Sequence, residues 1–311
     1  MVGATRPFRF GVQSRNMGPR ESWLATIRRI EELGYSSVSW ADHFVGGLDP
    51  IASLAAAAVA TERLRLTSFV FDNDFRHPAV LAMSAGTIDI LSGGRLELGI
   101  GAGWMKPEYT QTGIPFDPPG VRIARLEETL QLLTQLFTGK PVTFRGEFYQ
   151  TEELTLPPVP VQQPHPPFVI GGGSRKILTL AGQYADIVGI TNRALPDGAK
   201  DLEDLTAEAM ERKLGWVREG AGARFSEIEL NMICVRVIIT DDREAAAAEM
   251  ARQLPLSVEQ ILDAPSILIG SVDQISATLL ERRDRFGVSN IVIVEPMMEE
   301  FAPVVANLAG R

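Results

Sequence analysis

The sequence predicts an α/β protein, a (β/α)8 TIM-like barrel with an inserted hairpin and connector after the fourth βα unit. The first observation is alternation, since short β-branched and aliphatic runs are separated by longer stretches of helical periodicity. The second is number, because eight such units within 311 residues are what a closed barrel requires. An open doubly wound sheet would want a GxGxxG turn after the first strand, and Gly11-Val12-Gln13-Ser14 lacks it. We therefore expect one domain over residues 1–311.

Eight runs carry the strand pattern, and most are followed by a helical stretch. The strands are expected at 8–14, 37–42, 64–71, 96–101, 168–170, 186–190, within 228–239 and at 290–294. The clearest helices are expected at 20–33, 51–62, 78–91 and 120–138. In the last of these, Leu126, Leu130 and Leu133 share one face with Phe137, and Gly139 ends the helix.

Residues 139–167 interrupt this repeat. Val142-Thr143-Phe144 and Phe148-Tyr149 flank a turn at Gly146, and a proline-rich stretch follows. Long insertions in compact domains often act as lids. We expect a hairpin and a rigid connector over the mouth of the barrel.

Composition limits the class of partner. The chain has a formal net charge of -9 and a pI near 5.0, which disfavours nucleic acid because phosphate binding needs a basic field. No uncharged apolar stretch approaches the roughly 18 residues of a membrane span, and the N-terminus lacks a signal-peptide core. The single cysteine, Cys234, fits a reducing compartment. We expect a cytoplasmic protein that acts on a small molecule.

An acid and an imidazole stand side by side after the second strand, in Trp40-Ala41-Asp42-His43-Phe44. The active site of a (β/α)8 barrel lies at the carboxyl ends of its strands. There Asp42 can accept hydrogen bonds, and His43 can hold or release a proton near neutral pH. From this segment alone, a loop-capping Asp42 and a structural His43 are an equally open interpretation.

Glycines mark two further strand ends. Gly101 and Gly103 close the fourth strand, and Gly171-Gly172-Gly173-Ser174 lies between the fifth strand and a helix. Glycine allows a ligand to approach the backbone closely, and free amides at a helix N-terminus bind phosphate. We expect a phosphate site at Gly171–Ser174. The alternative is a tight turn in which Ser174 caps the helix.

Other catalytic chemistries have little support in the sequence. No HxH, HExxH or CxxC spacing indicates a metal site, and no GxSxG motif indicates a covalent nucleophile. Cys234 lies in an apolar run and is expected to be buried. One histidine, one aspartate, aromatic residues and a phosphate cradle suit a bound redox cofactor that carries out the chemistry itself.

Taken in order, the motifs resemble the luciferase-like monooxygenase superfamily and, within it, the oxidoreductases that depend on the deazaflavin coenzyme F420. The resemblance runs from about residue 8 to 190 and continues more loosely to the end. FMN-dependent members share most of the motifs. They are Gly34-Tyr35-Ser36-Ser37-Val38 with Asp42-His43-Phe44, Arg76-His77-Pro78-Ala79, Leu91-Ser92-Gly93-Gly94-Arg95, Gly99-Ile100-Gly101-Ala102-Gly103-Trp104, and Pro164-His165-Pro166-Pro167 with Ile170-Gly171-Gly172-Gly173.

The resemblance implies a TIM-like barrel with an insertion after the fourth unit. It also implies a non-prolyl cis peptide behind the cofactor ring, which falls here at Ser68–Phe69. In the family the equivalent of His43 lies near the redox-active carbon, so catalysis is assigned to His43 and Asp42. The cofactor-binding residues that it implies are Asp42, Ser68, Phe69, Gly101, Gly103, Gly171, Gly172, Gly173, Ser174 and Arg193.

One position departs from the family members that oxidise sugar phosphates, which carry a glutamate directly after the fourth-strand glycines. Trp104 stands there, and the next acid, Glu108, comes about one helical turn later. The sequence therefore disfavours a sugar phosphate. Trp40, Phe71 and Trp104, with Phe69, predict an aromatic pocket for a hydrophobic or planar substrate.

Three functions are consistent with the sequence, and we give the preferred one first. We expect hydride transfer between coenzyme F420 and an organic substrate, in either direction. The first alternative is a monooxygenase that uses reduced FMN and molecular oxygen. The second is a barrel that binds a cofactor without catalysis, which the presence of His43 and the triple glycine disfavours. The resemblance leaves a homodimer open, and we expect no metal.

Overall fold

The chain folds into a closed parallel barrel, which confirms the predicted fold class. The computed structural model describes residues 6–195 and 199–311. The main sheet has the order β3-β2-β1-β13-β10-β9-β8-β5-β4, and β3 also pairs with β5, which closes the barrel. Both β3 and β4 pair with β5, so they are two parts of one interrupted strand. The strands are β1 (Arg9–Gln13), β2 (Ser37–Trp40), β3 (Arg65–Ser68), β4 (Phe71–Asp72), β5 (Leu96–Gly101), β8 (Phe168–Gly172), β9 (Ile187–Ile190), β10 (Glu229–Ile233) and β13 (Val288–Val294).

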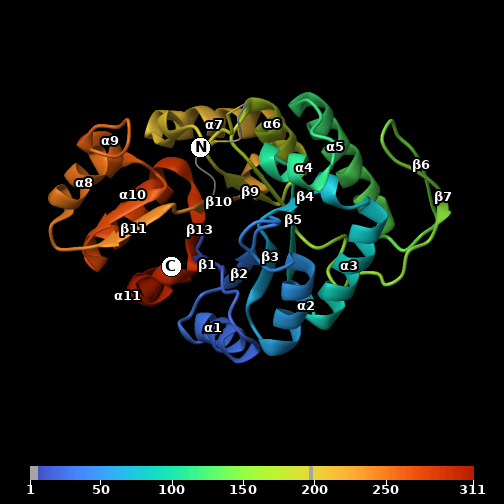
Figure 1. The fold of residues 1–311 in the computed structure, drawn as a ribbon, viewed down its shortest axis with the longest axis horizontal. Helices are drawn as coiled ribbons and strands as arrows, with labels where there is room; N and C mark the ends of the chain where they lie inside the picture. The colour runs from blue at the N-terminus through green and yellow to red at the C-terminus, as the bar shows by residue number, and fades with distance from the viewer. Residues whose placement is uncertain (1–5, 196–198) are drawn as a thin grey trace.

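Helices surround the strands (Figure 1). The four clearest predictions correspond to α1 (Arg20–Glu32), α2 (Pro50–Ala60), α3 (Pro78–Leu91) and α5 (Pro119–Leu136). The others on the barrel are α4 (Lys106–Thr112), α6 (Arg175–Tyr184), α7 (Ala207–Ala221), α10 (Val272–Phe286) and α11 (Met298–Leu308), with 3-10 turns at η1 (Asn73–Phe75), η2 (Leu202–Leu205), η3 (Gly222–Glu227) and η4 (Glu295–Met297). Within residues 6–195 and 199–311, none of the helices combines the length and apolar content that a bilayer crossing requires.

The third strand is interrupted one residue later than the resemblance implied. The non-prolyl cis peptide is Phe69–Val70, and the expected position, Ser68–Phe69, is wrong. The amide of Phe69 still donates to the carbonyl of Trp40 at 2.8 Å, so pairing with β2 continues through Phe69. The next strand accommodates this irregularity, because a Cβ on Gly99 would lie 1.8 Å from the Ser68 carbonyl oxygen and one on Gly101 would lie 2.7 Å from Val70 Cγ2.

The insertion contains the predicted hairpin, which contacts the outer helix α5 and, through Tyr149, residues Asn73 and His77 that follow β4. β6 (Val142–Arg145) and β7 (Gln150–Leu154) pair antiparallel at the periphery in Figure 1. The Glu128 carboxylate on α5 accepts the amides of residues 147–149 at 2.6–3.2 Å. The connector then presses the Pro158 carbonyl against Gly86 of α3. These contacts attach the segment to α3 and α5 and leave its predicted role over the mouth a prediction.

A small unit that the sequence did not predict follows the seventh barrel strand. The run expected within 228–239 divides into β10, which belongs to the barrel, and β11 (Arg236–Ile239), which pairs with β12 (Ile267–Gly270) in a separate sheet. Between them lie α8 (Arg243–Ala251) and α9 (Val258–Asp263). This satellite unit, residues 236–270, has its own apolar cluster, to which Leu205 of the barrel contributes. It lies to one side of the barrel in Figure 1.

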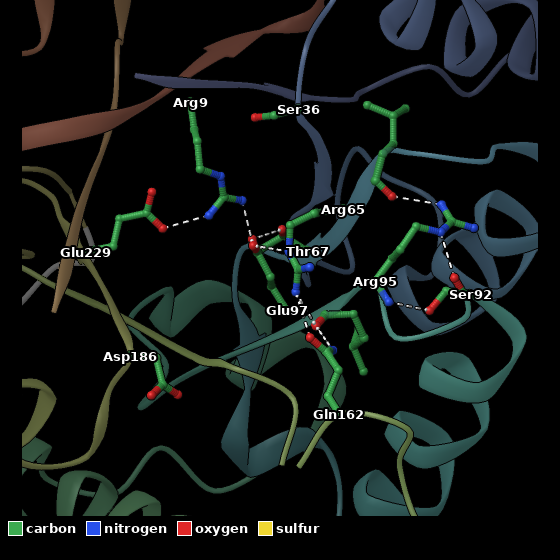
Figure 2. A network of polar contacts seen from close by, with 12 residues as sticks. Arg9, Ser36, Arg65, Thr67, Ser92, Arg95, Glu97, Gln162, Asp186 and Glu229 are labelled. Carbon is green, nitrogen blue, oxygen red and sulfur yellow. Dashed lines mark hydrogen bonds and ion pairs between the residues drawn. The ribbon is translucent and has the colours of Figure 1, made fainter. Parts of the chain in front are cut away.

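The amino end of the barrel is filled by a paired ionic network (Figure 2). Arg9 bridges Glu97 at 2.6 Å and Glu229 at 2.7 Å. Glu97 also accepts bonds from Arg65 at 2.5 Å and from the Thr67 hydroxyl at 2.9 Å. Burial opposes ionisation of Glu97, but Arg9 and Arg65 outweigh it and hold the pKa of that carboxyl below its usual value. The network closes the barrel floor and leaves the opposite end for a site.

Candidate active site

At the carboxyl end of the barrel, the loop after β2 and helix α4 bring His43 and Glu108 together. His43 Nδ1 lies 2.9 Å from Glu108 Oε2, and the Glu108 side chain is only 3% exposed. The backbone amide of Val45 donates to Glu108 Oε1 at 3.3 Å. Because a carboxylate accepts hydrogen bonds, this contact assigns the Nδ1 proton to His43. In the described part of the chain His43 Nε2 has no hydrogen-bond partner, so it is available for proton exchange.

Asp42 is bound by its neighbours on both oxygens. The Arg76 guanidinium forms a two-pronged pair with it, with Nη2 2.9 Å from Oδ1 and Nη1 against Oδ2. The Asp72 amide donates to Oδ2 at 2.9 Å. Asp42 therefore joins the loops that follow β2 and β4, and it fixes the backbone from which His43 projects. This is a positioning role.

Asp72 forms a second buried acidic centre next to that pair. The Tyr109 hydroxyl lies 2.8 Å from both of its oxygens and 3.1 Å from Asp74 Oδ2. Burial raises the pKa of Asp72 to about 7; the charges of Asp74 and Asp42 act in the same direction, while bonds from the Asp74 amide and Tyr109 oppose the rise. Asp74 is itself paired with Arg125 at 2.6 Å. Asp72 therefore changes its protonation within the physiological range.

The strand end at Gly171–Ser174 has the features of an anion cradle. A Cβ on Gly171 would meet nothing closer than 3.7 Å, so packing within the protein does not require glycine there. Gly173 differs, because a Cβ would lie 2.6 Å from the Arg193 amide nitrogen. Ser174 occupies the N-cap position of α6, as the alternative predicts, but its side chain makes no capping bond to the helix. The first amides of α6 are thus left for an anion.

Other residues assigned to the cofactor have partners within the protein. Arg193 pairs with Asp201 at 2.5 Å and is largely exposed. The Ser68 hydroxyl is buried and exchanges bonds with the backbone of Gly99, both at 2.9 Å. Gly103 has φ +70°, and a Cβ there would lie 1.8 Å from the Tyr109 hydroxyl. These contacts explain why an arginine, a serine and a glycine stand at these three positions, and no bound ligand is needed for that explanation.

The predicted aromatic pocket is only partly assembled. Trp104 meets the His43 ring edge to face, with centroids 5.8 Å apart. Trp40 instead stacks on Trp23 of α1 at 6.0 Å and is 3% exposed, so its placement in the pocket is wrong. Alternation along β2 explains this result, since successive side chains point to opposite faces of a strand.

Two other aromatic residues have different surroundings. Phe71, 1% exposed, is covered by the Arg76 guanidinium 4.9 Å from its ring, so it too offers no open surface. The Phe69 ring comes within 3.3 Å of the position of a Cβ on Gly189 of β9. β9 is not a neighbour of β3 in the sheet, so Phe69 extends into the barrel interior.

Three site residues were not recognised from the sequence. In the sequence Glu108 stands about one helical turn after the fourth-strand glycines, but α4 folds it back onto His43. Arg76 was noted only as part of a motif, although it neutralises Asp42. Lys200, which places Nζ 4.2 Å from the Trp104 ring centroid, gave no sequence signal. Among the residues described, no three histidine, cysteine, aspartate or glutamate side chains gather as a metal site requires.

Comparison with known proteins identifies the family. The model described as luciferase-like monooxygenase matches residues 1–288, so the chain belongs to that family, and the resemblance is confirmed. An F420-dependent glucose-6-phosphate dehydrogenase of Intrasporangium calvum is 39% identical over 183 residues, covering 56% of this chain and 54% of that protein. An FMNH2-dependent dimethylsulfone monooxygenase of Pseudomonas putida is 32% identical over 195 residues, covering 61% and 53%. The matched region thus spans about half the length of these two relatives.

The fold has a close counterpart among solved structures. Coenzyme F420-dependent tetrahydromethanopterin reductase from Methanopyrus kandleri superposes with a TM-score of 0.77 over 97% of this chain and 98% of that one. Sequence identity is 19%, so the similarity concerns the barrel and not the chemistry.

Proposed function

We propose that this protein is an oxidoreductase that transfers a hydride between coenzyme F420 and a small organic substrate. The observation that carries the proposal is the His43–Glu108 pair at the carboxyl end of the barrel, where β8, the neighbour of β5, ends in the Gly171–Ser174 cradle. The dehydrogenase relative from Intrasporangium calvum supports the choice of coenzyme.

The residues present fit such a coenzyme. Its phosphate would be held by the free amides that open α6, beside the unobstructed Gly171. When bound, the deazaflavin supplies two-electron hydride chemistry. Phe69, inside the barrel, offers an apolar surface to a planar ring. Arg193 would serve this site through its backbone, which abuts Gly173, since its guanidinium is already paired.

The protein's own residues handle the proton. Glu108 fixes the tautomer and orientation of His43, so that Nε2 is the ring nitrogen that faces away from the carboxylate. His43 can then take a proton from a substrate hydroxyl, or return one to a carbonyl oxygen, as the hydride leaves or arrives. Asp42 and Arg76 hold the loop in place during this exchange.

A second candidate is a monooxygenase that uses reduced FMN and oxygen. The Pseudomonas putida relative favours it. The phosphate cradle would suit either coenzyme, because both carry a phosphate group.

Equilibrium titration of the protein with oxidised F420 and with FMN, followed by tryptophan quenching, tests the proposal. We expect micromolar binding of F420 and binding of FMN at least tenfold weaker. Preference for FMN would transfer the assignment to the monooxygenase. Binding of neither would favour a barrel without catalysis.

We also propose a homodimer through the outer faces of α2 and α3. Val59, Val80, Met83, Ile90 and Leu91 are 45–71% exposed on these helices. The one charged residue of the two helices, Asp89, is buried and bonded to Gln162 at 2.7 Å. An apolar face without exposed charge can pack against the same face of a second copy of the chain, related by a two-fold axis.

Sedimentation velocity checks the dimer. Met83→Glu should shift the wild-type dimer to monomer, because it buries a charge in the interface. Leu280→Glu on α10, also an exposed apolar helix position, is the control and should leave the dimer intact. A monomeric wild type would refute the dimer and leave the hydride-transfer proposal unaffected.

A further inference from the structure

An apolar cavity of about 300 Å³ lies where the carboxyl ends of β9 and β10 meet the satellite unit. Its walls come from three places that are distant in sequence: the barrel strands, the η2–α7 segment and the satellite. The principal apolar wall residues are Ile190, Leu202, Met210, Met232, Leu254 and Ile267. A volume of this size is at the lower end of the range for small-molecule pockets.

The cavity adjoins the active site through a short chain of contacts. Lys200 lines the cavity, and its Nζ lies 4.2 Å from the centroid of the Trp104 ring. Trp104 also meets the His43 ring edge to face. A molecule with its body in the cavity and one end at Lys200 therefore reaches toward the imidazole that moves the proton.

The charged groups of the cavity differ in how they are neutralised. Lys213 Nζ pairs with Asp204 Oδ2 at 2.6 Å, and both side chains are buried. Arg236 is exposed at the solvent edge and donates to the Val235 carbonyl at 3.4 Å. Among described residues Lys200 has no carboxylate partner; its ammonium contacts the Asn192 carbonyl at 3.4 Å and the Trp104 ring. Burial, and then the charge of Lys213, lower the pKa of Lys200 to about 8.

A partly buried ammonium with no carboxylate partner among the described residues favours an anion, and an apolar wall favours hydrocarbon. A phosphate dianion would want several cations with multiple donors, and among the residues that the structure describes Lys200 is the one part-buried cation of the cavity without a carboxylate partner. The cavity therefore suits one negative charge on an otherwise apolar body.

We propose that this cavity binds the body of the substrate, and that the substrate is a hydrophobic monocarboxylate, aromatic or branched, whose carboxylate pairs with Lys200. This deepens the proposed function and rests on it for the reaction, but binding alone is testable without the coenzyme. Neither a sugar nor a phosphate has the apolar surface that these walls would bury.

Calorimetric titration with 2-naphthoate, its uncharged analogue 2-naphthamide and glucose 6-phosphate tests the assignment. We expect 2-naphthoate to bind at least about tenfold more tightly than the other two. Lys200→Met keeps the apolar length of the side chain and removes the charge. It should weaken 2-naphthoate about tenfold or more and change 2-naphthamide less than about threefold. The exposed Lys140→Met is the matched control and should change neither.

A second variant tests the cavity itself. Leu254→Trp adds volume at a half-buried wall residue and should weaken both naphthyl compounds equally. If Lys200→Met weakened the binding of 2-naphthoate and 2-naphthamide equally, the pairing of the carboxylate with Lys200 would be overturned. Unchanged binding in Leu254→Trp, with circular dichroism like that of the wild type, would place the ligand elsewhere. Tighter binding of glucose 6-phosphate would contradict the substrate class.

Adding saturating F420 separates this inference from the proposed function. Retained 2-naphthoate affinity, within about threefold, supports a substrate cavity. Displacement of 2-naphthoate by F420 would assign the cavity to the coenzyme and overturn the inference alone. Binding of 2-naphthoate without any binding of F420 would refute the proposed coenzyme and leave the cavity assignment standing.

Discussion

The two ends of the barrel use similar residues in opposite ways. At the amino end, each of Arg9, Arg65, Glu97 and Glu229 contacts a side chain of opposite charge (Figure 2). At the carboxyl end, His43 keeps Nε2 without a partner and Lys200 has no carboxylate among the described residues. A saturated network stabilises one arrangement, whereas unsatisfied groups at a concave end are available to a ligand. For these charged groups, the two ends therefore differ in pairing: the amino end has paired its charges, and the carboxyl end keeps Nε2 and one ammonium for a ligand.

The largest expected effect is on stability at the amino end. Glu97→Ala should lower the free energy of unfolding by about 2–4 kcal/mol, because it leaves the part-buried Arg9 and Arg65 without the buried carboxylate that they share. Urea denaturation measures the loss. A change below about 1 kcal/mol would mean that the network is no more than a surface-like pairing.

His43→Ala should show the reverse pattern at the carboxyl end. We expect turnover, with whichever substrate the wild type accepts, to fall about a hundredfold or more, since proton transfer is lost. F420 affinity should stay within about tenfold and stability nearly unchanged, because His43 is partly exposed. Stopped-flow absorbance of the coenzyme measures turnover, and unchanged turnover would remove His43 from the mechanism.

Glu108→Gln should have a smaller effect that differs in kind. The amide keeps a hydrogen bond to His43 but no longer places a negative charge beside the ring. We expect about a tenfold loss of turnover, with the basic limb of the pH–rate profile displaced. A loss of the same size at every pH would indicate a structural role for Glu108 alone.

Asp72→Asn should have the smallest effect, and its sign depends on pH. The folded-state pKa of about 7 lies above the ordinary value of 3.8, so the folded protein binds more protons and wild-type stability falls as pH rises from about 4 to 7. Asparagine removes this fall but weakens the bonds from Tyr109 and Asp74. We expect a net gain of about 1 kcal/mol at pH 8 and none at pH 5, measured by thermal unfolding. Equal effects at both pH values would exclude titration of Asp72.

Sequence periodicity predicted the barrel well because each strand and helix has its own local pattern. The seventh strand shows where this fails: residues 228–239 form one apolar run, yet Cys234 and Val235 separate a barrel strand from a satellite strand. Apolar content alone does not predict which sheet a strand joins, because a strand is buried both in the barrel and in the satellite sheet. Likewise the hairpin at 142–154 was predictable, but its docking on Glu128 was not.

For the site, the sequence by itself determined the carboxyl-end positions of Asp42, His43 and Gly171–Ser174, because strand ends and glycine runs are local features. Only the tertiary structure decided that Glu108 orients His43, that Trp40 belongs to the core, and that Lys200 opens onto an apolar cavity. The reason is physical: a side chain's chemistry is encoded at its own position, whereas its hydrogen-bond partners and desolvation come from segments that only folding brings together.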